Sequence, residues 1–124
     1  MYGKVYDWHT LEGPFVVHRG GRYHLFYSGG SWQEPTYGVA HAVADRPDGP
    51  WVETAREPLL RSVPGVVGPG HNSVVTTPDG LDVMVYHAWD VEQTARRMCL
   101  DPIRWTPDGP VVDGPSTGPT TLER

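Results

Sequence analysis

Two stretches of the sequence, FVVHRGGRYHLFYS at residues 15–28 and SVVTTPDGLDVMVYH at residues 73–87, share one pattern. Each begins with apolar residues, passes through Gly-Gly or Asp-Gly, and continues with alternating apolar and polar residues to a tyrosine. These dipeptides supply the positive φ angles that a two-residue hairpin turn requires. The pattern therefore predicts two β-hairpins that are related as copies of an internal repeat.

The repeat continues downstream of both hairpins. Further strand-like segments lead to the same turn motif, Pro47-Asp-Gly-Pro50 in one copy and Pro107-Asp-Gly-Pro110 in the other, 60 residues apart. The tyrosines of the two hairpins, Tyr27 and Tyr86, lie 59 residues apart. A period near 60 residues that holds about four short strands is typical of β-propeller blades.

The expected architecture is therefore all-β, a fragment of a β-propeller with two four-stranded blades. We place the first blade unit at residues 10–60, the second at residues 66–115, and a flexible C-terminal tail at residues 116–124. A propeller closes with roughly four to eight blades, and an open pair leaves sheet edges and faces uncovered. We therefore expect a partial propeller: a fragment, a truncated gene product, or a subunit completed by another chain or by further copies of itself.

Composition and charge narrow the class of protein. Gly (15) and Pro (13) together make up about 23 % of 124 residues, which leaves little room for helices. No apolar run approaches the roughly 20 residues of a membrane span, and the net charge of −5 argues against a nucleic-acid partner. The single cysteine, Cys99, excludes an internal disulfide. We expect no signal peptide, and a cytoplasmic protein if Met1 is the natural start.

The first candidate for chemistry is Glu12, in the motif Leu11-Glu-Gly-Pro14 that precedes the first hairpin. A glutamate at the mouth of a sheet acts as a general acid where burial and neighbouring carboxylates keep it protonated. The alternative is a solvated glutamate in a turn.

The second candidate is His71, in Gly68-Pro-Gly-His-Asn-Ser73 at the matching position of the second copy. Two glycines and a proline around one histidine indicate a tight loop that aims the imidazole at a fixed point, where it would contact a metal ion or substrate. The alternative is a histidine satisfied by loop carbonyls. The other histidines lack the His-x-x-x-His or His-x-Glu spacing of a catalytic zinc site.

The third candidate is Tyr86-His-Ala-Trp-Asp90 together with Arg96-Arg97. Aromatic rings and arginines at strand ends are common contacts of sugars, through ring stacking and bidentate hydrogen bonds to hydroxyls. The alternative is that Trp89 covers the edge of the core and the arginines are solvated. Trp51 and Trp105, beside the repeated turns, are expected in the core.

With these residues placed, the chain resembles family 43 of the glycoside hydrolases from about Trp8 to Pro115. Members of that family are five-bladed β-propellers that act on arabinans, arabinoxylans and xylo-oligosaccharides, and the chain resembles their C-terminal part. The resemblance rests on Glu12-Gly-Pro14 followed by Tyr23-His-Leu-Phe-Tyr-Ser28, on Gly68-Pro-Gly-His71 followed by the second hairpin, and on Tyr86-His-Ala88 with Arg96 nine residues before Trp105.

The resemblance implies a role for five residues. Glu12 matches the general acid that protonates the leaving glycosidic oxygen. His71 matches the histidine that contacts a calcium or similar ion at the propeller axis, partly through water. Arg96 matches the arginine that holds sugar hydroxyls, and Trp32 and Trp89 would border the sugar site. No organic cofactor is implied.

The resemblance also implies that the catalytic base of the family is missing from these residues. Members of the family invert configuration, with a carboxylate base roughly 6.5–9.5 Å from the acid. In the family the base and a second aspartate precede the Glu-Gly-Pro motif by many residues, whereas eleven residues precede Glu12 and Asp7 matches neither motif. We therefore expect a chain that carries the acid without the base.

The leading hypothesis is thus a glycosidase that acts on arabinose- or xylose-containing plant oligosaccharides or polysaccharides by inverting acid/base hydrolysis. The alternative is a non-catalytic carbohydrate-binding or structural propeller module that assembles with further chains. A retained sugar affinity after Glu12→Gln would favour the binding module.

Overall fold

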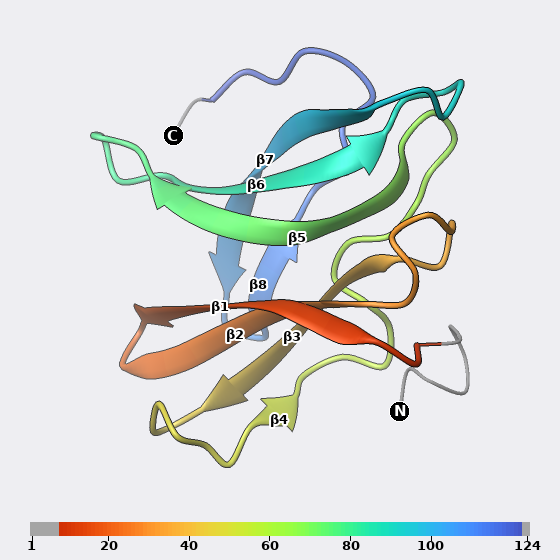
Figure 1. Ribbon diagram of the computed structural model, residues 1–124. Coiled ribbons are helices and arrows are strands. Elements are labelled where there is room, and N and C mark those ends of the chain that lie inside the picture. Colours follow the sequence, from red (N-terminus) through yellow and green to blue (C-terminus); the bar gives the residue numbers. More distant parts are fainter. Residues whose placement is uncertain (1–7, 123–124) are drawn as a thin grey trace.

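The computed structural model describes residues 8–122, and over this range the chain forms two four-stranded antiparallel sheets and no helix (Figure 1). In each sheet every strand pairs with the next one along the chain, in the orders β1-β2-β3-β4 and β5-β6-β7-β8. The strands are β1 (Leu11–Arg19), β2 (Arg22–Gly29), β3 (Gly38–Ala44), β4 (Val52–Glu53), β5 (Val67–Thr76), β6 (Asp82–Trp89), β7 (Arg96–Thr106) and β8 (Gly109–Val112). The predicted all-β architecture with two four-stranded units is confirmed. Within the described range, no helix suited to crossing a membrane occurs.

The two predicted hairpins form, but only the first has a two-residue turn. Gly20 and Gly21 both have positive φ, and Arg19 pairs directly with Arg22. In the second hairpin the ladder ends at Thr76 and Asp82, so the connection is five residues long, and of its Asp-Gly dipeptide only the glycine has a positive φ. Beyond the ladder, the amide of Thr77 donates to the carbonyl of Leu81 at 2.8 Å, and the amide of Gly80 donates to the carbonyl of Thr77 at 2.9 Å, so the turn closes around Pro78, Asp79 and Gly80.

The repeated Pro-Asp-Gly-Pro motifs form different connections. In the first copy the motif lies in a loop of seven residues between β3 and β4. In the second copy Thr106 pairs directly with Gly109, so only Pro107 and Asp108 form the turn and the rest of the motif belongs to β8. The strand before it, β7, is a single continuous strand rather than two segments.

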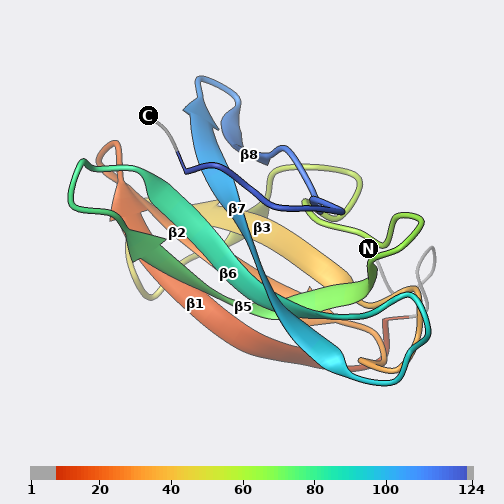
Figure 2. The same cartoon turned by 90° about the horizontal axis from the view of Figure 1, so that it is seen from above.

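The hydrophobic core lies between the two sheets. β5 contacts β1, β2 and β3. In Figure 2, which looks down from above, β5 and β6 lie in front of β1 and β2. The core consists of buried side chains from both sheets and from the segment between them, namely Phe26, Val39, Leu60, Val66, Met84, Tyr86, Ala88, Ile103 and Val112. Trp105 packs against this core, as predicted. Trp51 does not: it is half-buried and lines the opposite face of the first sheet.

That opposite face is apolar and open. Because side chains alternate along a strand, the burial of Phe26 between the sheets directs its neighbours Leu25 and Tyr27 to the far side. These two side chains line a hollow of about 650 Å³ with Trp51 and with Val52, which is 60 % exposed. On the second sheet, Met98 is 78 % exposed. The uncovered faces expected of an open pair of blades are therefore present.

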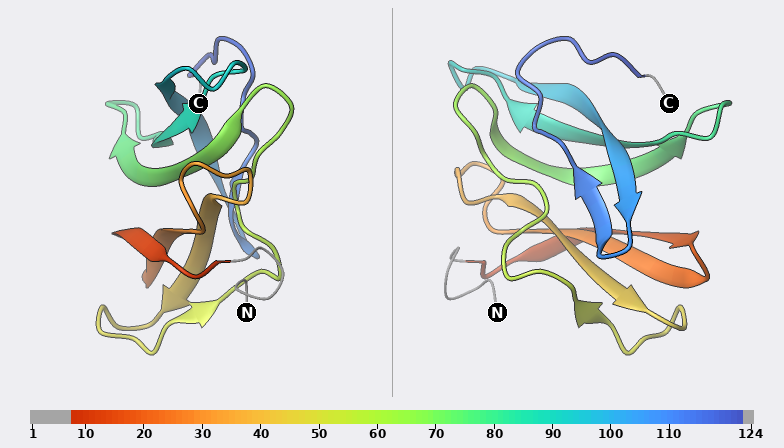
Figure 3. Two further views of the ribbon diagram at one scale, coloured as in Figure 1. Left: turned by 45° about the vertical axis from the view of Figure 1, so that its right-hand side comes forward. Right: turned by 180° about the vertical axis from the view of Figure 1, so that it is seen from behind.

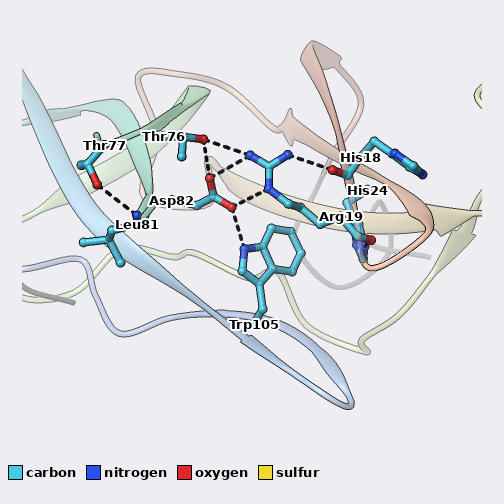
Figure 4. A network of polar contacts seen from close by, with 8 residues as sticks. All are labelled: His18, Arg19, His24, Thr76, Thr77, Leu81, Asp82 and Trp105. Atoms are coloured by element: carbon cyan, nitrogen blue, oxygen red, sulfur yellow. Dashed lines mark hydrogen bonds and ion pairs between the residues drawn. The ribbon is translucent and has the colours of Figure 1, made fainter. Parts of the chain in front are cut away.

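A buried ion pair joins the two sheets at the end of β1 away from Glu12 (Figure 4). Arg19 donates from Nε to Asp82 Oδ2 at 2.7 Å and from Nη2 to Oδ1 at 2.8 Å. Asp82 also accepts hydrogen bonds from Trp105 Nε1 and from Thr76 Oγ1. These contacts, with that of Arg19 the largest, lower the pKa of Asp82 to about 2 although the side chain is only 5 % exposed.

The C-terminal tail has no strand over residues 113–122, but its beginning is held (Figure 3). Ser116 donates its amide to Asp101 Oδ2 at 3.0 Å and its hydroxyl to Oδ1, while Tyr86 donates its hydroxyl to Oδ2. Pro115 is buried, and residues 116–120 line a hollow together with residues of β6 and β7. The tail therefore begins as a packed segment, because the buried Asp101 carboxylate needs donors that β7 itself does not supply.

Two buried histidines form a hydrogen-bonded chain in the first sheet. His24 Nε2 lies 3.2 Å from the carbonyl of Arg19, and His24 Nδ1 lies 3.0 Å from His41 Nε2. His41 Nδ1 lies 2.7 Å from Thr54 Oγ1. The carbonyl can only accept, so His24 carries its proton on Nε2, His41 carries its own on Nε2, and Thr54 donates. With both imidazoles neutral, every donor of this hydrogen-bonded chain has an acceptor.

We expect this pair to make the stability of the chain depend on pH. Burial, and then His24, lower the pKa of His41 to about 4 from its ordinary value of 6.5. The unfolded chain therefore binds the proton first, and the free energy of unfolding falls by about 3 kcal/mol as the pH drops from 6.5 to 4. Urea unfolding between pH 7.5 and 4.5 measures this slope, which His41→Gln should flatten and exposed His18→Gln should leave unchanged. A His41→Gln slope equal to that of the wild type would contradict the assignment.

Candidate functional site

The predicted acid, Glu12, lies half-buried at the start of β1, opposite Ser28 of β2. The ladder is irregular between Glu12 and Phe15, where Gly13 has a φ of 60°. A Cβ on Gly13 would lie 3.1 Å from Cγ of His71 and 3.3 Å from its Cα. The Glu-Gly-Pro motif thus brings the backbone beside Glu12 against His71 of the second sheet.

Tyr37, just before β3, fixes the Glu12 carboxyl group. Its side chain is fully buried, and its hydroxyl donates to Glu12 Oε1 at 2.7 Å. Burial and then the hydrogen bond to Glu12 raise the pKa of Tyr37, so the hydroxyl remains a donor. The ring lies where Gly70 has no side chain, since a Cβ there would come within 2.0 Å of Tyr37 Cε1. A tyrosine of the first sheet therefore packs directly on the backbone of β5.

The sequence predicts a tight loop at His71, whereas the structure places this residue inside β5, at an irregular part of the strand. Its φ of 50° lies in the left-handed region, which is strained for a non-glycine residue. The pairing of β5 with β6 is irregular on both sides of Gly70, and the amide of His71 donates to Ser28 Oγ at 2.7 Å instead. The imidazole itself is exposed, with its ring 6.3 Å from that of His87. This irregular part of β5 therefore presents His71 to the surface, against the backbone that follows Glu12.

His87 of β6 lies between Tyr37 and Arg96. Its ring stacks on that of Tyr37 at 5.9 Å with an interplanar angle of 7°, and its Nε2 lies 3.5 Å from Arg96 Nη1. Burial and then the positive charge of Arg96 lower the pKa of His87, so the imidazole is neutral at neutral pH. Arginine only donates, which makes Nε2 the acceptor and places the proton on the buried Nδ1.

The predicted sugar contacts form one cluster. The Arg96 guanidinium lies 4.5 Å from the centre of the Trp32 ring. Trp32 and Trp89 stack at 5.7 Å with an interplanar angle of 17°, and Trp89 Nε1 donates to the carbonyl of Trp32 at 2.9 Å. His71, His87 and Arg96 line a shallow hollow of about 290 Å³. Four of the five predicted site residues thus belong to one cluster. Glu12 reaches this cluster through Tyr37 and Gly13, and it also lines the hollow on the far face of the first sheet.

Sequence reasoning missed two residues of this cluster, Tyr37 and His87. Tyr37 belongs to no motif that the sequence analysis singles out. His87 lies inside the motif Tyr86-His-Ala88, but it was excluded only as a metal ligand because its spacing to other histidines fits no zinc site. The signal that could have identified His87 is its motif, which is followed directly by the predicted sugar contact Trp89.

His71 alone does not make a metal site. Calcium takes six to eight oxygen ligands, and no group of three or more histidine, cysteine or acidic side chains with suitable positions occurs in the described part of the chain. The described residues therefore do not fit a calcium ion by themselves. Contact of His71 with an ion at the propeller axis remains a prediction that needs ligands from outside these residues.

A family model, that of the glycosyl hydrolases family 43, matches residues 2–111 of the chain. The chain belongs to this family. A crystal structure of a thermostable family 43 glycoside hydrolase superposes with a TM-score of 0.84 at 34 % identity, over 92 % of this chain and 38 % of that one. The family 43 neighbours are five-bladed β-propellers, and the two sheets described above correspond to a fragment of that ring.

Two curated relatives are similar over most of this chain. A beta-D-galactofuranosidase of Aspergillus niger is 37 % identical over 106 residues, which are 82 % of this chain and 31 % of the relative. An extracellular exo-alpha-(1->5)-L-arabinofuranosidase of Streptomyces avermitilis is 31 % identical over an alignment of 134 positions, which covers 87 % of this chain and 28 % of the relative. The family 43 chain thus spans about a third of the length of the curated relatives it matches.

Proposed function

We propose that this chain carries the general acid and part of the sugar pocket of an inverting family 43 glycosidase. The substrate would be an arabinose- or xylose-containing oligosaccharide or polysaccharide. The observation that carries the proposal is the Glu12 carboxyl group, which Tyr37 holds beside the cluster of His71, His87 and Arg96. The two relatives described above are named for furanosidase activities, which supports a sugar in the furanose form as the first to test.

In this proposal each side chain has a defined task. Glu12 donates its proton to the glycosidic oxygen as the bond to the sugar breaks. Arg96 donates hydrogen bonds to sugar hydroxyls, and Trp32 and Trp89 border the site with apolar ring surface. Because the His87 imidazole is neutral, it adds no positive charge that would compete with Arg96 for an acceptor.

We infer that the base lies outside the described residues. Asp82 and Asp101 are buried and already bound by several donors. Glu53 lines a hollow on the far face of the first sheet together with Glu12, but its carboxylate already accepts a hydrogen bond from Tyr27. No acidic side chain of the described range lines the hollow between His71 and Arg96. Asp7, which the sequence matched to neither motif of the family, lies outside the described residues.

The test measures hydrolysis and sugar binding by the purified chain in the presence of calcium. We expect no turnover of aryl α-L-arabinofuranoside, β-D-galactofuranoside or β-D-xyloside. Calorimetry should show saturable binding of an arabino- or xylo-oligosaccharide that Arg96→Ala weakens about tenfold, because a charged hydrogen bond is lost. Glu53→Gln is the matched control for Glu12→Gln in the hydrolysis assay, since Glu53 is also bound by a tyrosine of the first sheet.

Three outcomes separate the possibilities. Turnover that Glu12→Gln abolishes and Glu53→Gln preserves would show that a base is present in the chain or in a second copy of it. Unchanged sugar affinity in Arg96→Ala, or no affinity in a folded sample, would overturn the sugar pocket. A discrete oligomer that binds sugar equally well after Glu12→Gln would favour the non-catalytic binding module.

A further inference from the structure

Tyr37 occupies the junction between the acid and the second sheet. Its side chain has no exposed surface, its hydroxyl contacts Glu12 of β1, and its ring packs on Gly70 of β5 and stacks on His87 of β6. Its amide donates to the carbonyl of Glu34 at 3.1 Å, which closes the turn before β3. Both ends of this residue are therefore fixed, and the hydroxyl has little freedom to move.

The direction of the hydrogen bond determines the roles of the two Glu12 oxygens. The Tyr37 hydroxyl remains protonated because burial and Glu12 raise its pKa. It donates to Oε1, which consequently acts as an acceptor. A protonated carboxyl group has only one O–H, so its proton belongs on the oxygen that does not accept this bond. That oxygen is Oε2.

We propose that Tyr37 is a positioning residue, which holds Glu12 through Oε1 and leaves Oε2 as the oxygen that carries and delivers the proton. This inference rests on the proposed function of Glu12 as the general acid. It goes further because it assigns the donating atom and places the control of the acid on Tyr37, just before β3, a residue that the hollow beside His71 does not include. A tyrosine that only filled space would need its ring but not its hydroxyl.

The chain contains a matched control for this role. Tyr27 donates its hydroxyl to Glu53 in the same sheet, on the face away from the core. Tyr37→Phe and Tyr27→Phe each remove one hydroxyl from a tyrosine-glutamate pair and keep the ring. The phenylalanine ring can still stack on His87, so we expect both variants to fold.

The experiment is a carbon-13 NMR titration of the carboxyl groups in the chain labelled at glutamate, with Glu12→Gln used to assign the resonance. The hydroxyl stabilises the ionised carboxylate, so we expect Tyr37→Phe to raise the titration midpoint of the Glu12 resonance by about one pH unit. Tyr27→Phe should leave that midpoint unchanged. An equal midpoint in the wild type and Tyr37→Phe would overturn the positioning role.

A measurement on the unmodified chain guards against a variant that does not fold. The Cζ resonance of Tyr37 should shift with the same midpoint as the Glu12 carboxyl, whereas Cζ of Tyr27 should not follow Glu12. A Tyr37 resonance that is insensitive to Glu12 would likewise overturn the proposal. Neither readout needs hydrolysis or bound sugar, so failure here is distinct from failure of Glu12 as an acid, which the turnover and binding experiments decide.

Discussion

Asp82→Ala is expected to lower the free energy of unfolding by about 2–3 kcal/mol, because it removes the charged acceptor of hydrogen bonds from Arg19 and from the Trp105 ring. Arg19 would lose both of its hydrogen bonds to Asp82 and keep, of its bonds to the second sheet, only the one to Thr76 Oγ1, and Trp105 Nε1 would lose its acceptor. A loss of this size is a large fraction of the stability of a typical domain. Urea unfolding measures it as a lower midpoint with an unchanged m-value.

Asp113→Ala provides the matched control for this loss. Asp113 also pairs with an arginine, Arg104, but its side chain is 69 % exposed, so we expect a change below about 1 kcal/mol. The two aspartates also differ in their response to acid. The pKa of Asp82 is lowered to about 2, so its stabilisation is present above pH 3.8 and is lost as the pH falls toward 2. Equal losses in Asp82→Ala and Asp113→Ala would contradict the bridging role of Asp82.

The sequence allows the strands to be predicted where local chemistry decides the structure. Alternating apolar residues and the Gly20-Gly21 turn are sufficient for the first hairpin, because the two glycines provide the φ angles that close it. The second hairpin differs because its turn is longer and is closed by the hydrogen bond from the Thr77 amide to the Leu81 carbonyl. The identical Pro-Asp-Gly-Pro motifs form different connections, because the lengths of the flanking strands, rather than the motif, decide which residues pair.

The sequence predicts which residues belong to the site, but it does not predict which of them contact one another. Glu12 and His71 are recognised from glycine-rich motifs whose glycines are needed for close packing between the sheets. Tyr37 acquires its role only through strand register and the packing of one sheet on the other, which join residues 25 and 50 positions apart in the sequence. The Arg19–Asp82 pair, 63 positions apart, could not be predicted for the same reason.

Gly70→Ala tests the packing on which the site depends. The added Cβ would lie 2.0 Å from Tyr37 Cε1 and 2.7 Å from Cδ1, and the buried ring has no free space to occupy. Gly70 does not have a positive φ, so the added methyl group acts by contact and not by backbone strain. We expect Gly70→Ala to lower the free energy of unfolding by about 3 kcal/mol, which is at the upper end of the usual cost of overpacking.

The same substitution should also disturb the acid. To avoid the new Cβ the Tyr37 ring must move, and the 2.7 Å hydrogen bond to Glu12 Oε1 would lengthen or break. The Glu12 carboxyl resonance of Gly70→Ala should then titrate like that of Tyr37→Phe, although the tyrosine is still present. Gly118→Ala is the control, because no heavy atom lies within 4 Å of its added Cβ.

The combination of the two readouts distinguishes a packing defect from the loss of the Tyr37 link. A less stable Gly70→Ala chain with a wild-type Glu12 titration would mean that another element absorbs the clash and Tyr37 stays in place. A stable chain with a wild-type titration would contradict the contact itself. Loss of stability together with the shifted titration is the result that the geometry requires, because one ring joins the β5 backbone to the Glu12 carboxyl group.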